Sequence, residues 1–192
     1  TVCILLSLSL TKSFSQTDKG NFLVGGTLGL GSSKTKDMQS EFETFSLNAS
    51  PNVSLFIIDN LAVGLSIPYL YSRMESNNQK HTRNNISVGP SARYYFTFNK
   101  MAVFPTVVYS FGMSTREGPV FDALSGSVQK QVIEQRFNSL IFGGGFTYFL
   151  NKHVGIEGIL SFERINYKYV TEEFSNVEIS SLKFNIGFQI YL

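Results

Sequence analysis

The chain has 192 residues, of which only 16% are charged, and a formal net charge of +2. Soluble domains average about 25% charged residues, so the sequence is poor in charge for its length. The near-neutral balance and the lack of a basic stripe exclude nucleic acid as a partner. No run of about 18 apolar residues occurs beyond the N-terminus, which excludes a membrane-spanning helix there. The length suits one domain.

The N-terminus, TVCILLSLSLTKSFSQ, is an apolar stretch followed by small and polar residues. This pattern is typical of a secretory signal peptide that lacks its basic start. The alternative is a buried first strand. We predict a signal peptide over residues 1–16, with cleavage near Ser15 or Gln16, and one domain over residues 17–192. Cys3, the single cysteine, falls in the leader, so the mature chain would pass through an oxidising compartment without disulfides.

Alternating apolar and polar residues predict eight β-strands, at about 20–31, 42–57, 61–72, 86–98, 102–114, 136–150, 154–167 and 178–192. Asn and Asp tolerate the positive φ of tight hairpins. They predict short turns at Asp59-Asn60, Asn99-Lys100 and Asn151-Lys152. Polar segments rich in Ser, Asn, Gln, Lys and Glu separate the other strands, and we interpret them as long loops at 32–41, 73–85, 115–135 and 168–176.

Most strands have one apolar face and one face of small and polar residues. In the last strand, Leu182, Phe184 and Ile186 lie opposite Lys183 and Asn185. The strands run to about 12–15 residues, whereas a usual strand has about 5–6 and a tilted membrane strand needs about 9–11. The small polar face is too thin for a soluble core, so the apolar face is expected to meet lipid.

An open sheet in lipid would leave unpaired backbone groups, which cost several kcal/mol each, so the sheet must close. We therefore predict an all-β fold, an eight-stranded antiparallel up-and-down transmembrane β-barrel preceded by a signal peptide. Both termini and the short turns are expected on the periplasmic side, and the long loops outside.

Aromatic residues gather near the short turns, where the interfacial girdle of a membrane barrel is expected. We assign to this girdle Phe56, Tyr94, Tyr95, Phe96, Phe98, Phe104, Phe146, Tyr148 and Phe149. A girdle lies on the outer surface, so these side chains are expected to face the membrane interface.

The repeated strands around Asn/Asp turns and the C-terminal SLKFNIGFQIYL resemble the small outer-membrane β-barrel domains of Gram-negative bacteria, of the OmpA/OmpX type. The segment FIIDNLAVGLSIPY and the leader ending SFSQ are similar to those of the Bacteroidota. The resemblance implies location in the bacterial outer membrane and recognition by the barrel-assembly machinery during biogenesis. The alternative for the last strand is a merely apolar strand. The implied assembly signal, which ends in Leu where an aromatic residue is usual, comprises Phe184, Ile186, Phe188, Ile190, Tyr191 and Leu192.

Four charged residues fall on the face that points inward: Arg93, Glu157, Glu163 and Lys183. An unpaired buried ion is costly, so we predict that they form a charge network in the lumen. The alternative is that each is solvated independently. An eight-stranded barrel is only wide enough for its own side chains, which makes a general porin improbable and leaves a narrow channel or transport component as the alternative function.

No constellation of residues indicates catalysis or metal binding. His81 lies in the second long loop and His153 in the third short turn, so they are expected on opposite sides of the membrane. A lipid-modifying enzyme of the outer membrane would need Ser, His and Glu within hydrogen-bond reach. A soluble, lipocalin-like barrel would need an apolar interior. We predict no enzyme, no cofactor and no metal site.

The remaining hypothesis is a structural or surface-interaction role. Loop residues carry function more often than the scaffold that holds them. Outer-membrane lipid is the expected environment, and extracellular ligands or proteins would bind through loops 32–41, 73–85, 115–135 and 168–176. The third loop is the longest, and its scattered apolar residues indicate that strands extend above the membrane there. We expect a monomer.

Overall fold

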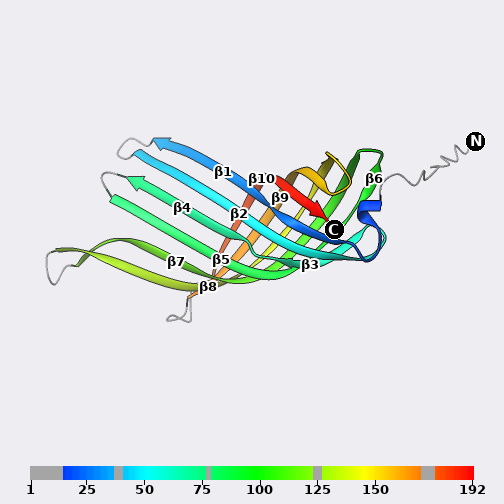
Figure 1. Ribbon diagram of the computed structural model, residues 1–192. Helices are drawn as coiled ribbons and strands as arrows, with labels where there is room; N and C mark the ends of the chain where they lie inside the picture. The colour runs from blue at the N-terminus through cyan, green and yellow to red at the C-terminus, as the bar shows by residue number, and fades with distance from the viewer. Residues whose placement is uncertain (1–14, 37–40, 77–78, 123–126, 170–175) are drawn as a thin grey trace, which may run out of the picture.

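The computed structural model describes residues 15–36, 41–76, 79–122, 127–169 and 176–192 (Figure 1). A 3₁₀ turn, η1 (Ser15–Thr17), precedes ten β-elements. No helix in these ranges is long and apolar enough to cross a membrane. The β-elements are β1 (Phe22–Lys36), β2 (Glu41–Ile58), β3 (Leu61–Ser66), β4 (Tyr69–Ser76), β5 (Gln79–Tyr94), β6 (Phe96–Phe98), β7 (Met101–Asp122), β8 (Ser127–Phe149), β9 (Val154–Tyr169) and β10 (Asn176–Tyr191).

The ten elements form one closed ring of eight antiparallel strands, because two of the strands are interrupted. The strand of β3 and β4 breaks at Ile67-Pro68, where Pro68 has no N–H to give to the ladder. Ser87 N still donates to Pro68 O (3.0 Å), so the strand stays attached. The strand of β5 and β6 breaks at Tyr95. Each strand pairs with the next along the chain, and β10 pairs with β1, so the predicted up-and-down eight-stranded fold is confirmed.

The barrel has two different ends. We call the end with the short turns, η1 and Leu192 the turn end, and the opposite end, where the longer hairpins connect, the hairpin end (Figure 1). Asn60 (φ 69°) and Asn99 (φ 52°) are left-handed at the turn end, as the short-turn prediction requires. Gln16 and Thr17 pack there too: Gln16 Nε2 donates to Asn151 O (3.0 Å) and Thr17 Oγ1 to Asn60 Oδ1 (2.7 Å).

Most of the predicted signal peptide, residues 1–14, lies outside the described residues. Its last predicted residue, Gln16, is buried against the barrel. Cleavage before Gln16 would keep this contact in the mature protein.

Every described residue of the four predicted long loops is in a strand, so the predicted boundaries are wrong. The ladder between β4 and β5 reaches Ser76↔Gln79, and that between β7 and β8 reaches Asp122↔Ser127. The predicted loops 32–41 and 168–176 are likewise shortened, by β1 and β2 and by β9 and β10. A strand outside the membrane has water on both faces, so it loses the apolar alternation while its backbone pairing continues.

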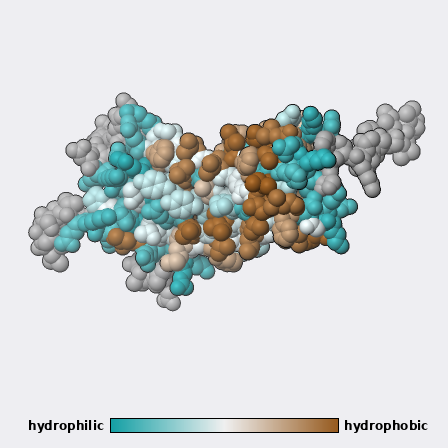
Figure 2. Space-filling model, in the orientation of Figure 1, coloured by the Kyte–Doolittle hydropathy of each residue, from teal (hydrophilic) through white to brown (hydrophobic). Residues whose placement is uncertain are grey.

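The alternation within the membrane holds as predicted. Apolar residues of the outer face are exposed, as at Leu182 (71%), whereas the inward Ser110 and Gln189 are fully buried. Hydrophobic residues form a brown belt between teal ends in Figure 2. The belt is the surface expected to meet hydrocarbon.

Four of the nine predicted girdle residues face the lumen instead. Phe56, Tyr95, Phe104 and Phe149 are 0–3% exposed. Phe56 shares the strand face of the inward Asn52 and Ser54, so strand parity, and not nearness to a turn, decides its direction. The remaining five point outward, as expected: Tyr94, Phe96, Phe98, Phe146 and Tyr148.

The seam that closes the ring is short. β1 and β10 pair from Leu23↔Tyr191 to Leu28↔Ile186, six pairs near the turn end, and Phe22 and Leu192 add a seventh through two backbone hydrogen bonds. β1 pairs with β2 along its whole length, from Phe22↔Leu55 to Lys36↔Glu41. Toward the hairpin end, β1 and β10 therefore diverge (Figure 1).

Candidate functional site: the barrel lumen

The strongest polar interaction inside the barrel joins Arg93 of β5 to Glu157 of β9. Arg93 Nη1 lies 2.9 Å from Glu157 Oε2, and the Glu157 side chain is fully buried. β7 and β8 separate the two strands in the ring, so the pair crosses the lumen. A buried ion pair needs further hydrogen bonds to offset the loss of solvent.

Glu157 has these further partners from three other places in the chain. Thr147 Oγ1 (3.1 Å) and the Tyr95 (3.3 Å) and Tyr191 (3.5 Å) hydroxyls donate to Oε1. Gln189 Nε2 donates to Oε2 at 3.2 Å. With Arg93, the carboxylate accepts five hydrogen bonds, so its charge is well satisfied within the barrel.

Aromatic and aliphatic side chains surround this pair and close the lumen at the turn end. The Arg93 guanidinium lies 5.3 Å from the centre of the Phe104 ring, a cation–π contact. The Tyr95 and Phe104 rings are 4.9 Å apart. We call this buried cluster the turn-end plug; it comprises Leu23, Phe56, Ala62, Tyr95, Ala102, Phe104, Phe149, Ile159 and Tyr191.

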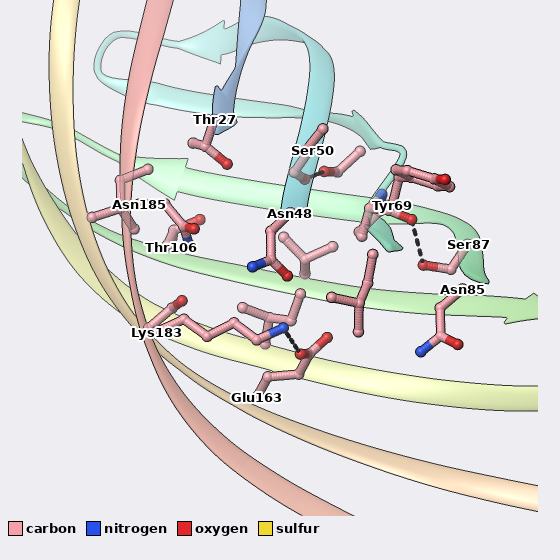
Figure 3. A pocket seen from close by; sticks show the side chains of 18 of the residues that line it. Thr27, Asn48, Ser50, Tyr69, Asn85, Ser87, Thr106, Glu163, Lys183 and Asn185 are labelled. Carbon is pink, nitrogen blue, oxygen red and sulfur yellow. Dashed lines mark hydrogen bonds and ion pairs between the residues drawn. The ribbon is translucent and has the colours of Figure 1, made fainter. Parts of the chain in front are cut away.

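A polar chamber lies next to the turn-end plug, on the side toward the hairpin end. Figure 3 shows Lys183 of β10 pointing toward Glu163 of the neighbouring strand β9 on its wall, and these side chains form an ion pair. Ser110 Oγ is hydrogen-bonded to Ser87 Oγ (3.1 Å) and Ser139 Oγ (2.8 Å) on the wall. The cavity measures about 90 Å³. Small-molecule sites are usually about 300–1,000 Å³, so this chamber is too small for a solute of that kind.

A second apolar cluster closes the chamber toward the hairpin end. It comprises Phe137, Ile165 and Tyr167, with Ile179 packed against it, and we call it the hairpin-end plug. The Phe137 and Tyr167 rings are 5.5 Å apart. Asn85 Nδ2 donates to the Tyr167 hydroxyl at 2.8 Å. Apolar clusters thus lie at two levels of the lumen, one on each side of the chamber.

The four lumen charges come together as two pairs and not as one network. Arg93 pairs with Glu157, and Lys183 pairs with Glu163, one level nearer the hairpin end. No ion pair between described residues connects the two. The two histidines are at opposite ends: His81 is in β5 near the hairpin end, whereas His153 Nδ1 lies 3.0 Å from Tyr191 O at the turn end.

The residues of the suggested assembly signal lie on β10 and just after it. Five of them, Phe184, Ile186, Phe188, Ile190 and Leu192, are on the outer face. Tyr191 points the other way and belongs to the turn-end plug.

Sequence reasoning missed the neutral partners of Glu157, namely Tyr95, Thr147, Gln189 and Tyr191. Their strand parity carries the signal, because each shares the inward face of its strand. What parity does not give is the level at which side chains of distant strands meet, since that depends on the register of all the intervening pairs.

A closed antiparallel ring with an apolar outer belt and a filled, polar lumen defines a membrane-spanning β-barrel of the bacterial outer-membrane class. The family described as the outer membrane protein beta-barrel domain matches residues 1–189, and the chain belongs to that family. A comparison with curated proteins finds no match.

Two solved structures share the fold, and a third is reported for comparison. A major outer membrane protein from Thermus thermophilus is similar with a TM-score of 0.54 and 12% identity, over 90% of this chain and 99% of that one. The translocator domain of the autotransporter NalP from Neisseria meningitidis has a TM-score of 0.51 and 10% identity, over 92% of this chain. The present chain spans 64% of that domain. Neisserial surface protein A has a TM-score of 0.46 and 16% identity, over 90% and 97% of the two chains.

Proposed function

We propose that the barrel is a non-conducting anchor that presents the β7–β8 hairpin outside the cell for interaction with other proteins. The observation that carries the proposal is the height of this hairpin. β5 pairs with β7 only as far as Thr82↔Glu117, whereas β7 and β8 continue together for five more pairs, to Asp122↔Ser127. At about 3.4 Å per residue, these five pairs extend about 17 Å past the last β5–β7 pair, whereas β5 continues for only three more residues, to Gln79.

The projecting hairpin has a candidate sheet edge on its β9 side. Among described residues, pairing of β8 with β9 ends at Gln135↔Tyr169, whereas its pairing with β7 continues to Asp122↔Ser127. Such an edge accepts an extended segment of another chain by strand addition. Lys130 and Glu117 form an ion pair across the two strands (2.7 Å), which supports the hairpin outside the membrane.

The two plugs support a non-conducting barrel over a channel, because both lie across the axis. The separation of His81 from His153 gives no support to a catalytic role. The orientation that we propose has the turn end in the periplasm, since short turns are typical of that side in bacterial barrels.

Orientation is tested by labelling single cysteines in intact cells. Cys3, the only cysteine, falls in the predicted signal peptide, so Gln129→Cys and Lys100→Cys each supply one reactive thiol. A membrane-impermeant maleimide should label Gln129→Cys in intact cells, and Lys100→Cys only after the outer membrane is permeabilised. The reverse pattern would contradict the orientation.

Strand addition is tested with a fluorescent peptide of alternating Thr and Val and a matched peptide with Pro at alternate positions, which cannot pair as a strand. Anisotropy should show binding of the first peptide only. A variant in which residues 119–130 are replaced by Asn-Gly keeps the Gly118↔Gln131 pair but removes the projection, and it should bind neither peptide. Equal binding of the first peptide to the full and shortened proteins would refute the proposal.

A further inference from the structure

A second and larger cavity lies on the hairpin side of the hairpin-end plug. Its volume is about 450 Å³, within the usual range of small-molecule sites. Strands β2, β4, β5, β7 and β8 contribute to its wall. The residues that matter below are Met74, His81, Arg83, Arg116 and Ile133.

Two arginines face each other on the wall of this cavity. Arg83 of β5 is the register partner of Arg116 of β7. Both continue the inward parity of their strands, shown by the buried Asn85 and Ser114. Like charges directly opposite each other on neighbouring strands repel. Arg83 and Arg116 therefore weaken the pairing of β5 with β7 at this position.

Tyr167 fixes both guanidinium groups. The Arg83 and Arg116 Cζ atoms lie 5.6 and 5.4 Å from the centre of its ring. The ring itself cannot turn freely, because it is buried against Phe137 and its hydroxyl accepts the hydrogen bond from Asn85. The two cations are therefore preorganised at the floor of the cavity.

Two nearby carboxylates have partners other than Arg83. Glu117, the one acidic residue of the lining, pairs with Lys130. Glu75 pairs with Arg73. No described carboxylate forms an ion pair with Arg83. His81 adds a third nitrogen-bearing side chain: its ring packs over Gly118, where a side chain on residue 118 would overlap it.

We propose that this cavity binds the oxyanion group, phosphate or carboxylate, of a small solute, with Arg83 and Arg116 as its principal ligands. The guanidinium fork matches such groups with two parallel hydrogen bonds. The bound anion would remove the repulsion between the cations. Met74 and Ile133 offer apolar contact to the uncharged part of the solute. The barrel wall separates these lumen-facing groups from lipid headgroups, so the ligand comes from solution.

The experiment is calorimetric titration of the folded protein in detergent micelles with sodium phosphate, sodium sulfate and sodium citrate, at constant ionic strength against sodium chloride. At least one of the three should bind. Arg83→Gln should weaken binding at least tenfold, and Arg83→Lys should weaken it less. Arg136→Gln is the matched control, because Arg136 is exposed on the outer face of β8 at the same end. It should leave the affinity unchanged. Absence of binding by all three anions, or equal weakening by Arg136→Gln, overturns the proposal.

Thermal unfolding supplies a second measurement that does not depend on one variant's folding. A ligand that binds only the folded state raises the unfolding temperature. The anion that binds should raise it for the wild type and for Arg136→Gln, but not for Arg83→Gln. An equal rise in all three proteins would identify a general salt effect and refute the site.

Discussion

Replacing Arg93 by Met tests whether the ion pair of the turn-end plug stabilises the barrel. Met keeps much of the length and the apolar contact with Phe104 but removes the charge. Glu157 would remain buried with four neutral donors. Breaking a buried pair on one side costs about 3–5 kcal/mol. The four remaining hydrogen bonds still hold the carboxylate, so we expect the lower end, a loss of about 3 kcal/mol.

The double variant Arg93→Met with Glu157→Gln separates the charge from the packing. It removes both charges and keeps an amide oxygen for the hydroxyl donors. Replacing both members of a buried pair is often close to neutral. We therefore expect the double variant to recover at least half of the loss, about 1.5–3 kcal/mol.

The assay is urea unfolding in detergent micelles, followed by circular dichroism and by the migration of unheated samples on a gel. The chain has no Trp, so these two readouts replace Trp fluorescence. An Arg93→Met variant that unfolds at the same urea concentration as the wild type would refute the reasoning. So would a double variant no more stable than the single one.

Two further predictions concern packing in the wall and lumen. Lys183→Met should cost less than Arg93→Met, about 1–2 kcal/mol in the same urea assay, because this pair is less buried: the side chains of Lys183 and Glu163 are 25% and 7% exposed, against 10% and 0% for Arg93 and Glu157. An equal cost would contradict this. Gly89→Ala should prevent folding or greatly lower the unfolding temperature, since a Cβ there would overlap the Tyr109 carbonyl. Gly144→Ala should be tolerated, because the nearest atom to an added Cβ is 3.6 Å away. Equal gel shifts for both variants would count against the strand spacing.

The lipid-facing side of the barrel wall could be predicted, because contact with lipid requires an apolar residue at every second position of each membrane-spanning strand. Leu182, Phe184 and Ile186 all had to face hydrocarbon, and the period of two then fixed the inward position of Lys183 and Asn185. The positions of the Asn turns followed from the positive φ that tight hairpins need.

The lumen could be predicted only in part. Parity places Arg93 and Glu157 on the inward face, but the five hydrogen bonds to Glu157 depend on register across several strands. Phe56 was misassigned because aromatic character suggests a membrane interface, although its parity matches Asn52.

The cavity at the hairpin end was missed for a related reason. Its arginines lie in segments 73–85 and 115–135, where the apolar alternation ends and the sequence was interpreted as loop. Outside the membrane the two faces of a strand no longer differ in polarity, so the sequence carries no signal for which side of the wall Arg83 and Arg116 occupy.

The short seam between β1 and β10 gives the Arg93–Glu157 pair a mechanical role. The seam joins the first and last strands with seven residue pairs, Phe22 and Leu192 included, so it is the junction at which the cylinder is most easily parted. Arg93 and Glu157 act as a tie across the diameter, and Gln189 and Tyr191 fasten the last strand to the same carboxylate. The curvature of the barrel wall is therefore also held from inside, by the buried Glu157 side chain of β9. Hydrogen bonds from three other strands, β5, β8 and β10, meet at this one carboxylate.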